Sequence, residues 1–315
     1  MTAPVLVIGE ALVDIVVPAP RVPRNGNGKS SAAPGGFAAN VAVGLARLGV
    51  PTELVARFGT DAYGDQLGAH LFGNGVQLAP GSVDPGSRTS TATATLDVDG
   101  VASYQFDITW DPPAMSLPRK CPAIHTGSIA TMLEPGATAI REFLESVVDQ
   151  PVTVTFDPNA RPSITPDPVP AWATVRRLAA LSDLVKLSDE DCRFFRPGAS
   201  PDEIAAELLT AERTKCVVIT LGGDGAIGVT RDIRVEVPAP AIEVVDTVGA
   251  GDSLMAALIA GLNKRGLLGA KRLAGLTDDD LRNVVDYAVK AAAITCTRHG
   301  ADPPTAADHL AKWGS

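Results

Sequence analysis

Short apolar runs alternate with longer amphipathic stretches along the chain, and the two patterns predict different elements. Short apolar runs that are closed by glycine, proline or polar residues are typical of buried strands. Alanine-rich stretches that end near a glycine are typical of helices. In the first quarter of the chain we expect strands at 5–8, 12–17 and 52–58, helices at 36–48 and 65–74, and a loop rich in Pro, Gly, Asn and Ser at 18–34.

The segment 88–107 has a different pattern of polar and apolar residues. It reads RTSTATATLDVDGVASYQFD, and its residues alternate in polarity on both sides of Asp99-Gly100. An Asp-Gly pair between two alternating runs predicts a β-hairpin with its turn at that pair. With the extended run 12–17, this hairpin predicts a small β-sheet lid, covering about 10–34 and 88–111, on a larger domain.

From about residue 123 onward, strand patterns and helix patterns alternate. This alternation predicts parallel strands joined by crossover helices, and therefore a three-layer α/β sandwich that forms a single domain over 1–315. The strands are expected at 123–125, 152–157, 184–187 and 216–221, and the helices at 136–149, 170–181, 189–195, 201–213, 252–264 and 278–297.

The charge and composition exclude some classes of partner. The formal net charge of −9 argues against a nucleic acid or an anionic membrane, because either would favour a basic face. A nucleotide stays compatible with this charge, because backbone amides and Mg²⁺ can neutralise phosphates locally. No uncharged apolar run is long enough to span a bilayer, and the region 1–17, interrupted by Glu10 and Asp14, predicts a strand rather than a signal peptide.

The cysteines and histidines do not form a metal-binding pattern. None of the four cysteines lies in a C-x-x-C pair, and the four histidines are scattered with no H-E-x-x-H motif. Zinc and a redox-active cysteine pair are therefore not expected, and the cysteines are expected to be reduced thiols in a cytoplasmic protein.

Two short motifs resemble nucleotide-binding fingerprints in the wrong context. The segment 223–228 fits G-x-G-x-x-G, but the residues after it predict strands and end in prolines, whereas the dinucleotide motif needs a helix there. Gly28-Lys29-Ser30 resembles the end of a phosphate-binding loop, but proline occupies position 23, where that loop needs its first glycine. We therefore expect neither a dinucleotide site nor that loop.

The strongest chemical signal is DTVGAGDSLMAALIAG at 246–261. A strand-like run, IEVVD, leads into a glycine-rich turn and then directly into an apolar helix. The backbone amides of Gly249, Ala250 and Gly251 would point toward an anion at the helix start, and the helix dipole would reinforce them. Asp252, in the first helical turn, would then lie beside that anion, although an N-terminal cap is the plainer interpretation of an Asp in this position.

A carboxylate at this position can act as a base. Asp252 could accept the proton of a hydroxyl group that attacks a phosphoryl group. A carboxylate is a weak base, but phosphoryl-transfer transition states are loose and the proton can leave late.

Two separate motifs together resemble a known family. DTVGAGDSLMAALIAG is similar to the C-terminal signature of the PfkB/ribokinase carbohydrate kinases, and PGGFAANVAVGLARLG at 34–49 is similar to their N-terminal signature. The two occur in the right order, some 200 residues apart, and the resemblance covers essentially the whole chain. It implies a ribokinase-like fold and an ATP-dependent sugar kinase in which Asp252 is the base.

The resemblance also implies a sugar site. The backbone of Gly35 and Gly36 would lie against the sugar, and the side chains of Asp14 and Asn40 would bind its hydroxyl groups. DPNAR at 157–161 is similar to a D-x-N-x-R segment whose arginine, here Arg161, reaches sugar or phosphate. As alternatives, Asn40 could only cap a loop, and Asp157 and Arg161 could pair with each other to brace their own loop.

A nucleotide site and two metal sites follow from the same resemblance. Ser188 and Asp191 stand where the family has N-x-x-E, so Asp191 is expected to reach Mg²⁺ through water, or else Ser188 and Asp191 only begin a helix. The nucleotide is expected against Ser188, Thr220, Gly222, Gly225, Gly249 and Gly251. The backbone carbonyls of Asp246, Val248, Thr295, Arg298 and Gly300 are expected to hold K⁺.

Fructokinase-like members match best among the family's substrate groups. A 2-keto-3-deoxygluconate kinase is the nearest rival, but that group has a Tyr and Arg pair in the lid. The present lid has Tyr104 without the Arg, and Asp107 and Asp111 would repel an acid. Ribokinase, nucleoside kinase, and a catalytically inactive sugar sensor stay open as alternatives, and the exposed lid face is a candidate homodimer interface.

Overall fold

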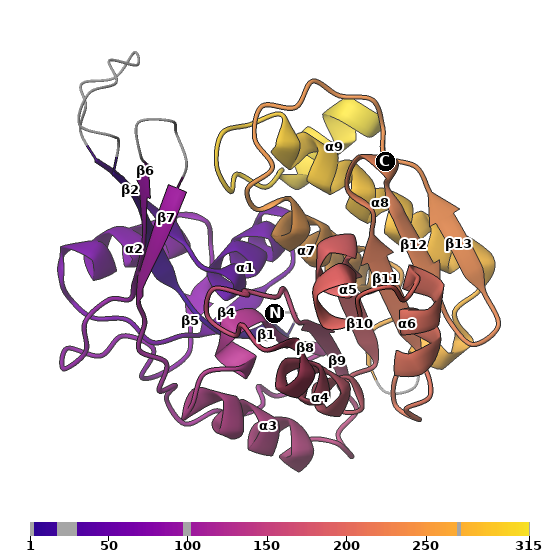
Figure 1. Cartoon of the computed structure of the whole chain (residues 1–315), viewed down its shortest axis with the longest axis horizontal. Helices are drawn as coiled ribbons and strands as arrows, with labels where there is room; N and C mark the ends of the chain where they lie inside the picture. Colours follow the sequence, from indigo (N-terminus) through magenta and orange to yellow (C-terminus); the bar gives the residue numbers. More distant parts are fainter. Residues whose placement is uncertain (1–2, 18–29, 97–101, 270–271, 315) are drawn as a thin grey trace.

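The computed structural model describes residues 3–17, 30–96, 102–269 and 272–314, which form two sheets flanked by helices (Figure 1). The turn expected at Asp99-Gly100 and the loop residue Lys29 lie outside these ranges. The nine-stranded sheet has the order β13-β12-β11-β10-β9-β8-β1-β4-β5. Its strands are β1 Val5–Ile8, β4 Thr52–Val55, β5 Gln77–Leu78, β8 Ala123–Gly127, β9 Thr153–Asp157, β10 Leu184–Ser188, β11 Cys216–Thr220, β12 Ala226–Val229 and β13 Arg234–Val237.

The helices follow the expected alternation closely, and the three-layer α/β sandwich is confirmed. Every predicted helix is present within a few residues of its expected bounds, and α9, near the C-terminus, is additional. None of the helices in the described ranges is long and apolar enough to cross a membrane. The α-helices are α1 Phe37–Arg47, α2 Ala62–Gly73, α3 Gly136–Ser146, α4 Pro168–Ala179, α5 Asp189–Phe195, α6 Pro201–Leu208, α7 Ala250–Lys264, α8 Asp278–Cys296 and α9 Ala306–Trp313.

Two local predictions were wrong. The expected loop 18–34 contains the start of a strand, β3 Ser31–Gly35, because these residues pair antiparallel with β2 Leu12–Val17. The run IEVVD at 242–246 is not a strand, although its β-branched residues favour one. Instead, the amides of Val245 and Asp246 both donate to the carbonyl of Cys296 at the end of α8, at 2.8 and 3.2 Å.

The strand order reverses next to β1, which is the place where open parallel sheets form a ligand-binding crevice. β1 pairs parallel with β4 on one side and with β8 on the other, so later strands are added to the sheet on both sides of β1. In open parallel sheets, ligands bind at the carboxyl ends of the strands where the order reverses. Glu10 follows β1, Ser128 follows β8, and Asp157 ends β9, so their side chains are candidates to line this crevice.

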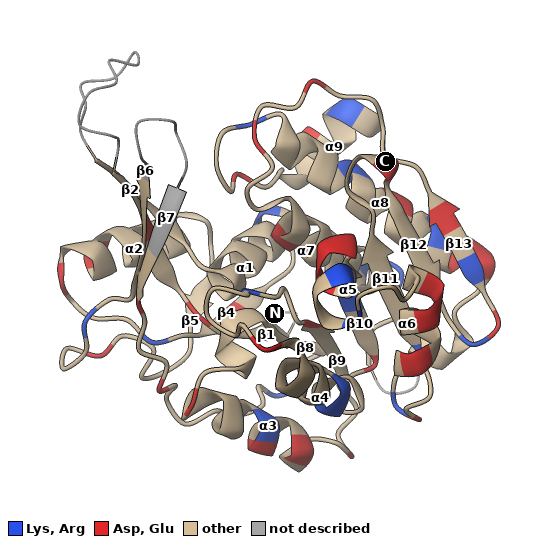
Figure 2. Ribbon diagram, viewed as in Figure 1, with Lys and Arg blue, Asp and Glu red and all other residues tan. Residues whose placement is uncertain are grey.

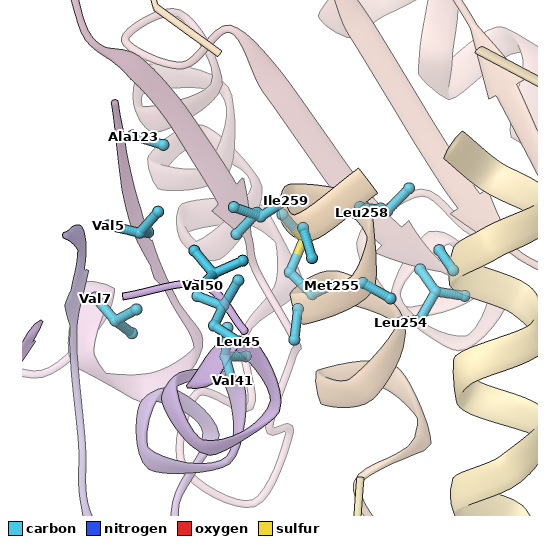
Figure 3. Packing of buried hydrophobic residues seen from close by; sticks show 14 of the residues in the cluster. Val5, Val7, Val41, Leu45, Val50, Ala123, Leu254, Met255, Leu258 and Ile259 are labelled. Carbon is cyan, nitrogen blue, oxygen red and sulfur yellow. The ribbon is translucent and has the colours of Figure 1, made fainter. Parts of the chain in front are cut away.

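Each face of the large sheet has its own hydrophobic core. One core lies between the sheet and the helices α1, α7 and α8, and includes Leu45, Met255 and Ile259 (Figure 3). The other lies under α3, α4, α5 and α6, and includes Phe156, Trp172 and Leu187. Because buried apolar side chains fix α1 against α7, the first turns of these two helices have a defined relative position.

The lid is a second, four-stranded sheet with the order β3-β2-β6-β7, completed by β6 Thr91–Leu96 and β7 Ala102–Asp107. It projects from one end of the large sheet (Figure 1). Only Gly9, Glu10 and Ala11 separate β1 from β2, and only Gly36 separates β3 from α1. The lid is therefore joined closely to the C-terminal end of β1 and to the N-terminal end of α1.

Charged side chains are spread over the periphery. In the view of Figure 2, acidic and basic residues lie together on α3, α5 and the edge strand β13, and no extended basic face is visible. The acidic balance of the chain is therefore distributed over the surface.

The contact between α1 and α7 should tolerate no added methyl group. A Cβ atom on Gly44 of α1 would lie 2.7 Å from the Cβ of Ala256 on α7, whereas nothing lies within 4 Å of the same position on Gly73 of α2. We expect Gly44→Ala to lower the free energy of unfolding by about 1–3 kcal/mol through overpacking. Gly73→Ala should instead raise it by roughly 0.5–1 kcal/mol through helix propensity. Urea denaturation of both variants measures the difference, and equal stabilities would contradict this account of the helix contact.

Candidate active site

Asp252 and Asn40 meet between the first turns of two helices. Asp252 lies in the first turn of α7, and Asn40 lies in the first turns of α1, 212 positions away in the sequence. The amide Nδ2 of Asn40 donates a hydrogen bond of 2.8 Å to Oδ2 of Asp252. The alternative that Asn40 only caps a loop is therefore wrong. Burial raises the pKa of Asp252, and the Asn40 hydrogen bond together with the charges of Arg161 and Lys186 opposes this rise.

The glycine-rich turn before Asp252 exposes backbone amides. Gly249 is the N-cap of α7 with φ 74°, a left-handed conformation, and a Cβ there would lie 2.6 Å from the Cβ of Ala301, so glycine is required. The amide of Ala250 donates to the carbonyl of Thr247 at 3.2 Å. Among the described residues, the amides of Gly249 and Gly251 donate no hydrogen bond. Of the three amides expected to bind an anion, two are therefore available and the third is shared with the turn.

The lid places Asp14 at the same crevice. A Cβ on Gly35 would lie 2.0 Å from Oδ2 of Asp14, so the carboxyl group of Asp14 covers Gly35 on the neighbouring strand. Gly36 has φ 96°, and a Cβ there would lie 2.7 Å from the carbonyl oxygen of Glu10. Desolvation and the charge of Asp252 raise the pKa of Asp14 to about 6, and the charge of Arg161 opposes them. Asp14 and Asp252 thus face one site from the lid and from α7.

Glu10 is an acidic residue that the sequence analysis did not single out. It is 4% exposed, and its Oε2 is buried without a hydrogen-bond partner. Burial raises its pKa to about 7, with Asp252 adding to the rise and Ser128 and Arg161 opposing it. Its sequence signal was a single acid between two apolar strands, in VLVIGEALVD. A buried carboxyl group without full hydrogen bonding is costly, so it marks a functional or strained position.

Lys186 is a second residue that the sequence analysis did not single out. It lies in β10, is 3% exposed, and its Nζ is 3.0 Å from Oδ2 of the buried Asp157. Burial alone would lower the pKa of Lys186, but the charges of Asp157, Asp191 and Asp252 outweigh burial and raise it. Its Nζ lies 3.2 Å from the position of a Cβ on Gly251, which puts a fixed cation beside the free amides. A lysine within the apolar strand LVKLS was the signal for this role.

Arg161 lies on the loop after β9, as expected, but its contacts differ from the predicted alternative. Asp157 pairs with Lys186, not with Arg161. The Nη1 atom of Arg161 donates to the side-chain oxygen of Asn159 at 2.7 Å and to the carbonyl oxygens of Asn159 and Ala160. The guanidinium is exposed, and its charge acts on Glu10, Asp14 and Asp252 alike. It is thus a shared counter-ion for the acids of the crevice.

Ser188 and Asp191 form a capping box at the start of α5. The hydroxyl group of Ser188 accepts from the amide of Asp191 at 3.0 Å, and Oδ2 of Asp191 accepts from the amide of Ser188 at 2.7 Å. Oδ1 of Asp191 accepts from the amide of Ala160 at 2.7 Å. Within the described ranges, no three His, Cys, Asp or Glu side chains gather as a metal site. This arrangement is compatible with Mg²⁺ bound mainly by phosphates and water, since Mg²⁺ often has few protein ligands.

Four of the six residues expected to bind the nucleotide line one cavity of about 570 Å³, whereas Gly249 and Ser188 do not line it. Thr220, Gly222 and Gly225 line one side, and Ala250 and Gly251 line another. The segment 239–244, which the sequence pattern partly assigned to a strand, forms a further wall, and residues of α8 close the cavity. Most of the lining is apolar, as suits the flat faces of a purine base, and Ala250 and Gly251 of the glycine-rich turn are part of it.

The two segments expected to hold K⁺ lie side by side. The carboxyl group of Asp246 accepts from the amides of Val248 and Gly300, at 3.0 and 2.8 Å. The amide of Asp246 also donates to Cys296, between Thr295 and Arg298. These contacts bring the segment with Asp246 and Val248 next to the end of α8 and the residues after it, where the other three expected carbonyl ligands lie. Nearby, Thr305 caps α9 with its hydroxyl group.

Together, these groups could transfer a phosphoryl group to a hydroxyl group. The crevice combines a carboxylate that can accept a proton, free amides and a buried lysine beside it, and a nucleotide-sized cavity that ends at the same turn. The acids of the crevice and Asn40 offer the hydrogen-bonding groups that a polyol requires. The geometry therefore supports the chemistry that Asp252 suggested from the sequence.

Comparisons with known proteins agree with this geometry. The chain is 35% identical over 291 residues to a fructokinase of Rhizobium leguminosarum bv. trifolii, covering 90% of this chain and 86% of that protein. A fructokinase from Xylella fastidiosa with bound ATP superposes with a TM-score of 0.84 at 23% identity, over 99% of both chains, which shows the fold. A double-mutant fructokinase from Vibrio cholerae O395, bound to fructose, ADP and a potassium ion, is 26% identical with a TM-score of 0.76, over 95% of this chain and 94% of that one.

A family model agrees with these relatives along nearly the whole chain. The model for pfkB family carbohydrate kinases matches residues 2–308. This match spans both glycine-containing signatures, the lid strands and the nucleotide cavity. The chain therefore belongs to the pfkB family of carbohydrate kinases and is an enzyme that phosphorylates a sugar hydroxyl group with ATP.

Proposed function

We propose that this kinase transfers the γ-phosphate of ATP to fructose and forms fructose 6-phosphate. The observation that carries the proposal is the Asn40–Asp252 hydrogen bond, which holds a carboxylate between the lid acid Asp14 and the free amides of the glycine turn. The names of the relatives support fructose as the acceptor, since the similar proteins from Rhizobium and Vibrio are fructokinases.

In the proposed mechanism, Asp252 accepts the proton of the attacking hydroxyl group. The ionised carboxylate is the active form, and Asn40 holds one of its oxygens so that the other can face the sugar. The amides of Gly249 and Gly251 and the ammonium group of Lys186 would stabilise the charge of the transferred phosphoryl group. Mg²⁺, when bound, would neutralise phosphate charge, with Asp191 as a water-mediated contact.

The electrostatics of the crevice favour a neutral acceptor. Glu10, Asp14 and Asp252 all act on this crevice, and each experiences the charge of Arg161. An acidic sugar would meet three carboxyl groups and a single shared cation, so a neutral polyol is the better fit. This supports fructose over 2-keto-3-deoxygluconate, and it leaves ribose or a nucleoside to be separated by experiment. The intact base and glycine turn argue against an inactive sugar sensor.

Three finer features stay predictions from the family resemblance. K⁺ at the carbonyl groups of Asp246, Val248, Thr295, Arg298 and Gly300 would hold the glycine turn in shape. A second copy of the chain would pack on the lid to form a homodimer. The enzyme would act in the cytoplasm, where ATP and reduced thiols coexist.

Replacement of the base tests the reaction directly. We expect Asp252→Asn to lower kcat about 10²–10⁴-fold, because the amide cannot accept the proton. ADP release would be measured with Mg·ATP, K⁺ and a panel of fructose, ribose, 2-keto-3-deoxygluconate and adenosine. Asp278→Asn, in the exposed first turn of α8, is the matched control and should be as active as the wild type. Fast turnover by Asp252→Asn would contradict the role of Asp252, and turnover on a different acceptor would replace fructose.

The pH profile tests the contact with Asn40. The hydrogen bond from Asn40 favours the ionised form of Asp252 and lowers its pKa. In Asn40→Ala the pKa of Asp252 should therefore rise, and the acid limb of kcat against pH should move to higher pH. Saturating fructose at each pH separates this shift from weaker sugar binding. An unchanged acid limb would mean that Asn40 does not tune the base.

Glu10 should make stability depend on pH. Its folded-state pKa of about 7 lies above the ordinary value of 4.5, so the folded protein keeps a proton that the unfolded chain releases. Wild-type stability should therefore fall as pH rises from 4.5 through 7. Glu10→Gln cannot ionise and should be more stable than the wild type at pH 8, by up to about 3 kcal/mol. Urea denaturation should show this difference shrink as pH falls, and a constant difference would contradict the raised pKa.

A further inference from the structure

Asp157 uses its two oxygens in two different parts of the site. It ends β9 and is fully buried. Oδ2 accepts from Nζ of Lys186 at 3.0 Å, and Oδ1 accepts from the backbone amide of Asn159 at 3.1 Å. One carboxylate thus joins β10, which carries the lysine, to the loop that carries Arg161.

The lysine contact reaches the phosphate end of the crevice. Nζ of Lys186 is close to Gly251, beside the free amides of the glycine turn. A buried ammonium group is stable only with a buried anion nearby, so Asp157 keeps Lys186 both charged and in place. The ammonium has three donors, and it can therefore bind a phosphate oxygen and Asp157 at the same time.

The loop contact controls the direction of Arg161. Asn159 has φ 38°, a left-handed conformation that costs free energy for a residue with a side chain. Its amide is held by Asp157, and the next amide, that of Ala160, is held by Asp191. Arg161 then donates to both oxygens of Asn159. The guanidinium therefore depends on a strained turn that buried carboxylates hold in place.

We propose that Asp157 is a positioning residue that couples the phosphate and sugar subsites, so that nucleotide binding orders the loop carrying Arg161. This inference rests on the proposed nucleotide and sugar sites. A phosphate oxygen that binds Lys186 restricts its ammonium group, the ammonium restricts Asp157, and Asp157 restricts Asn159. Sugar that binds afterwards has less ordering entropy to lose, so its affinity rises. By linkage, sugar must raise nucleotide affinity by the same factor.

Hydrogen exchange at the loop tests the first half of this coupling without reference to any sugar. Mg·ADP should slow amide exchange in the segment 157–165 of the wild type, measured by mass spectrometry. In Asp157→Asn it should not, because a side-chain amide has one oxygen and can satisfy only one of the two contacts. The matched control is Asp183→Asn. Asp183 also accepts a backbone amide, that of Val154, and pairs with Arg213, but it precedes β10 at the opposite edge of the sheet. In Asp183→Asn, Mg·ADP should slow amide exchange in the segment 157–165 as it does in the wild type.

Calorimetric titration of fructose with and without Mg·ADP tests the second half. We expect Mg·ADP to lower the Kd of fructose at least about fivefold in the wild type and in Asp183→Asn, and less than about twofold in Asp157→Asn. The inference is overturned if Mg·ADP lowers the Kd of fructose by the same factor in Asp157→Asn as in the wild type, or if Mg·ADP does not slow amide exchange in the wild type. Either result leaves the kinase assignment intact. Slowed exchange without any fructose binding would support the coupling and contradict the proposed sugar.

A second variant covers the case in which Asp157→Asn does not fold. Asn159→Gly retains the left-handed turn and the contact with Asp157, but it removes the side-chain acceptor of Arg161. It should weaken fructose binding, leave Mg·ADP binding unchanged, and reduce the factor by which Mg·ADP strengthens fructose binding. If Mg·ADP strengthens fructose binding as much in Asn159→Gly as in the wild type, the proposed connection between Asn159 and Arg161 is overturned.

Discussion

The close contact between α1 and α7 is the constraint on which the site depends. These helices come from opposite ends of the chain, yet Gly44 and Ala256 let their backbones approach without intervening side chains. Their first turns carry Asn40 and Asp252, and the hydrogen bond between these residues requires the helices to hold this separation. The two family signatures therefore encode a packing contact as well as a set of ligands. A base in this crevice needs both signatures folded against each other.

The charged side chains around Asp252 differ in how fully other groups compensate their charge. Lys186 and Asp157 compensate each other at the expected phosphate end. At the expected sugar end, the buried Glu10 has Ser128 and the charge of Arg161, and the exposed Asp14 has the charge of Arg161. Buried carboxylates without a dedicated partner are unfavourable, and they are tolerated where a ligand supplies the missing hydrogen bonds. This asymmetry suits an enzyme whose donor is highly charged and whose acceptor is neutral.

Local patterns were sufficient for most of the fold, because the strands and helices have clear periods and the motifs lie at element ends. Two kinds of feature could not be predicted. The run 242–246 has strand propensity, but it hydrogen-bonds to the end of α8, which is a tertiary choice that propensity cannot reveal. Lys186 lies inside an apolar run and Glu10 lies between two of them. A single charged residue there does not change the hydrophobic pattern, so the pattern gives it no role. Only the strand order, which brings β1, β8, β9 and β10 together, reveals that these charges face the site.

The connection between the lid and α1 has a mechanical consequence. The lid strand β3 passes into α1 through Gly36 alone, and Gly36 touches the backbone of Glu10 in the link between β1 and β2. The link from β1 to β2 and the link from β3 to α1 therefore lie next to each other. A sugar bound by Asp14 would therefore hold a strand whose link to β1 lies against the start of the helix that carries Asn40, so the lid and the support of the base are joined at one place.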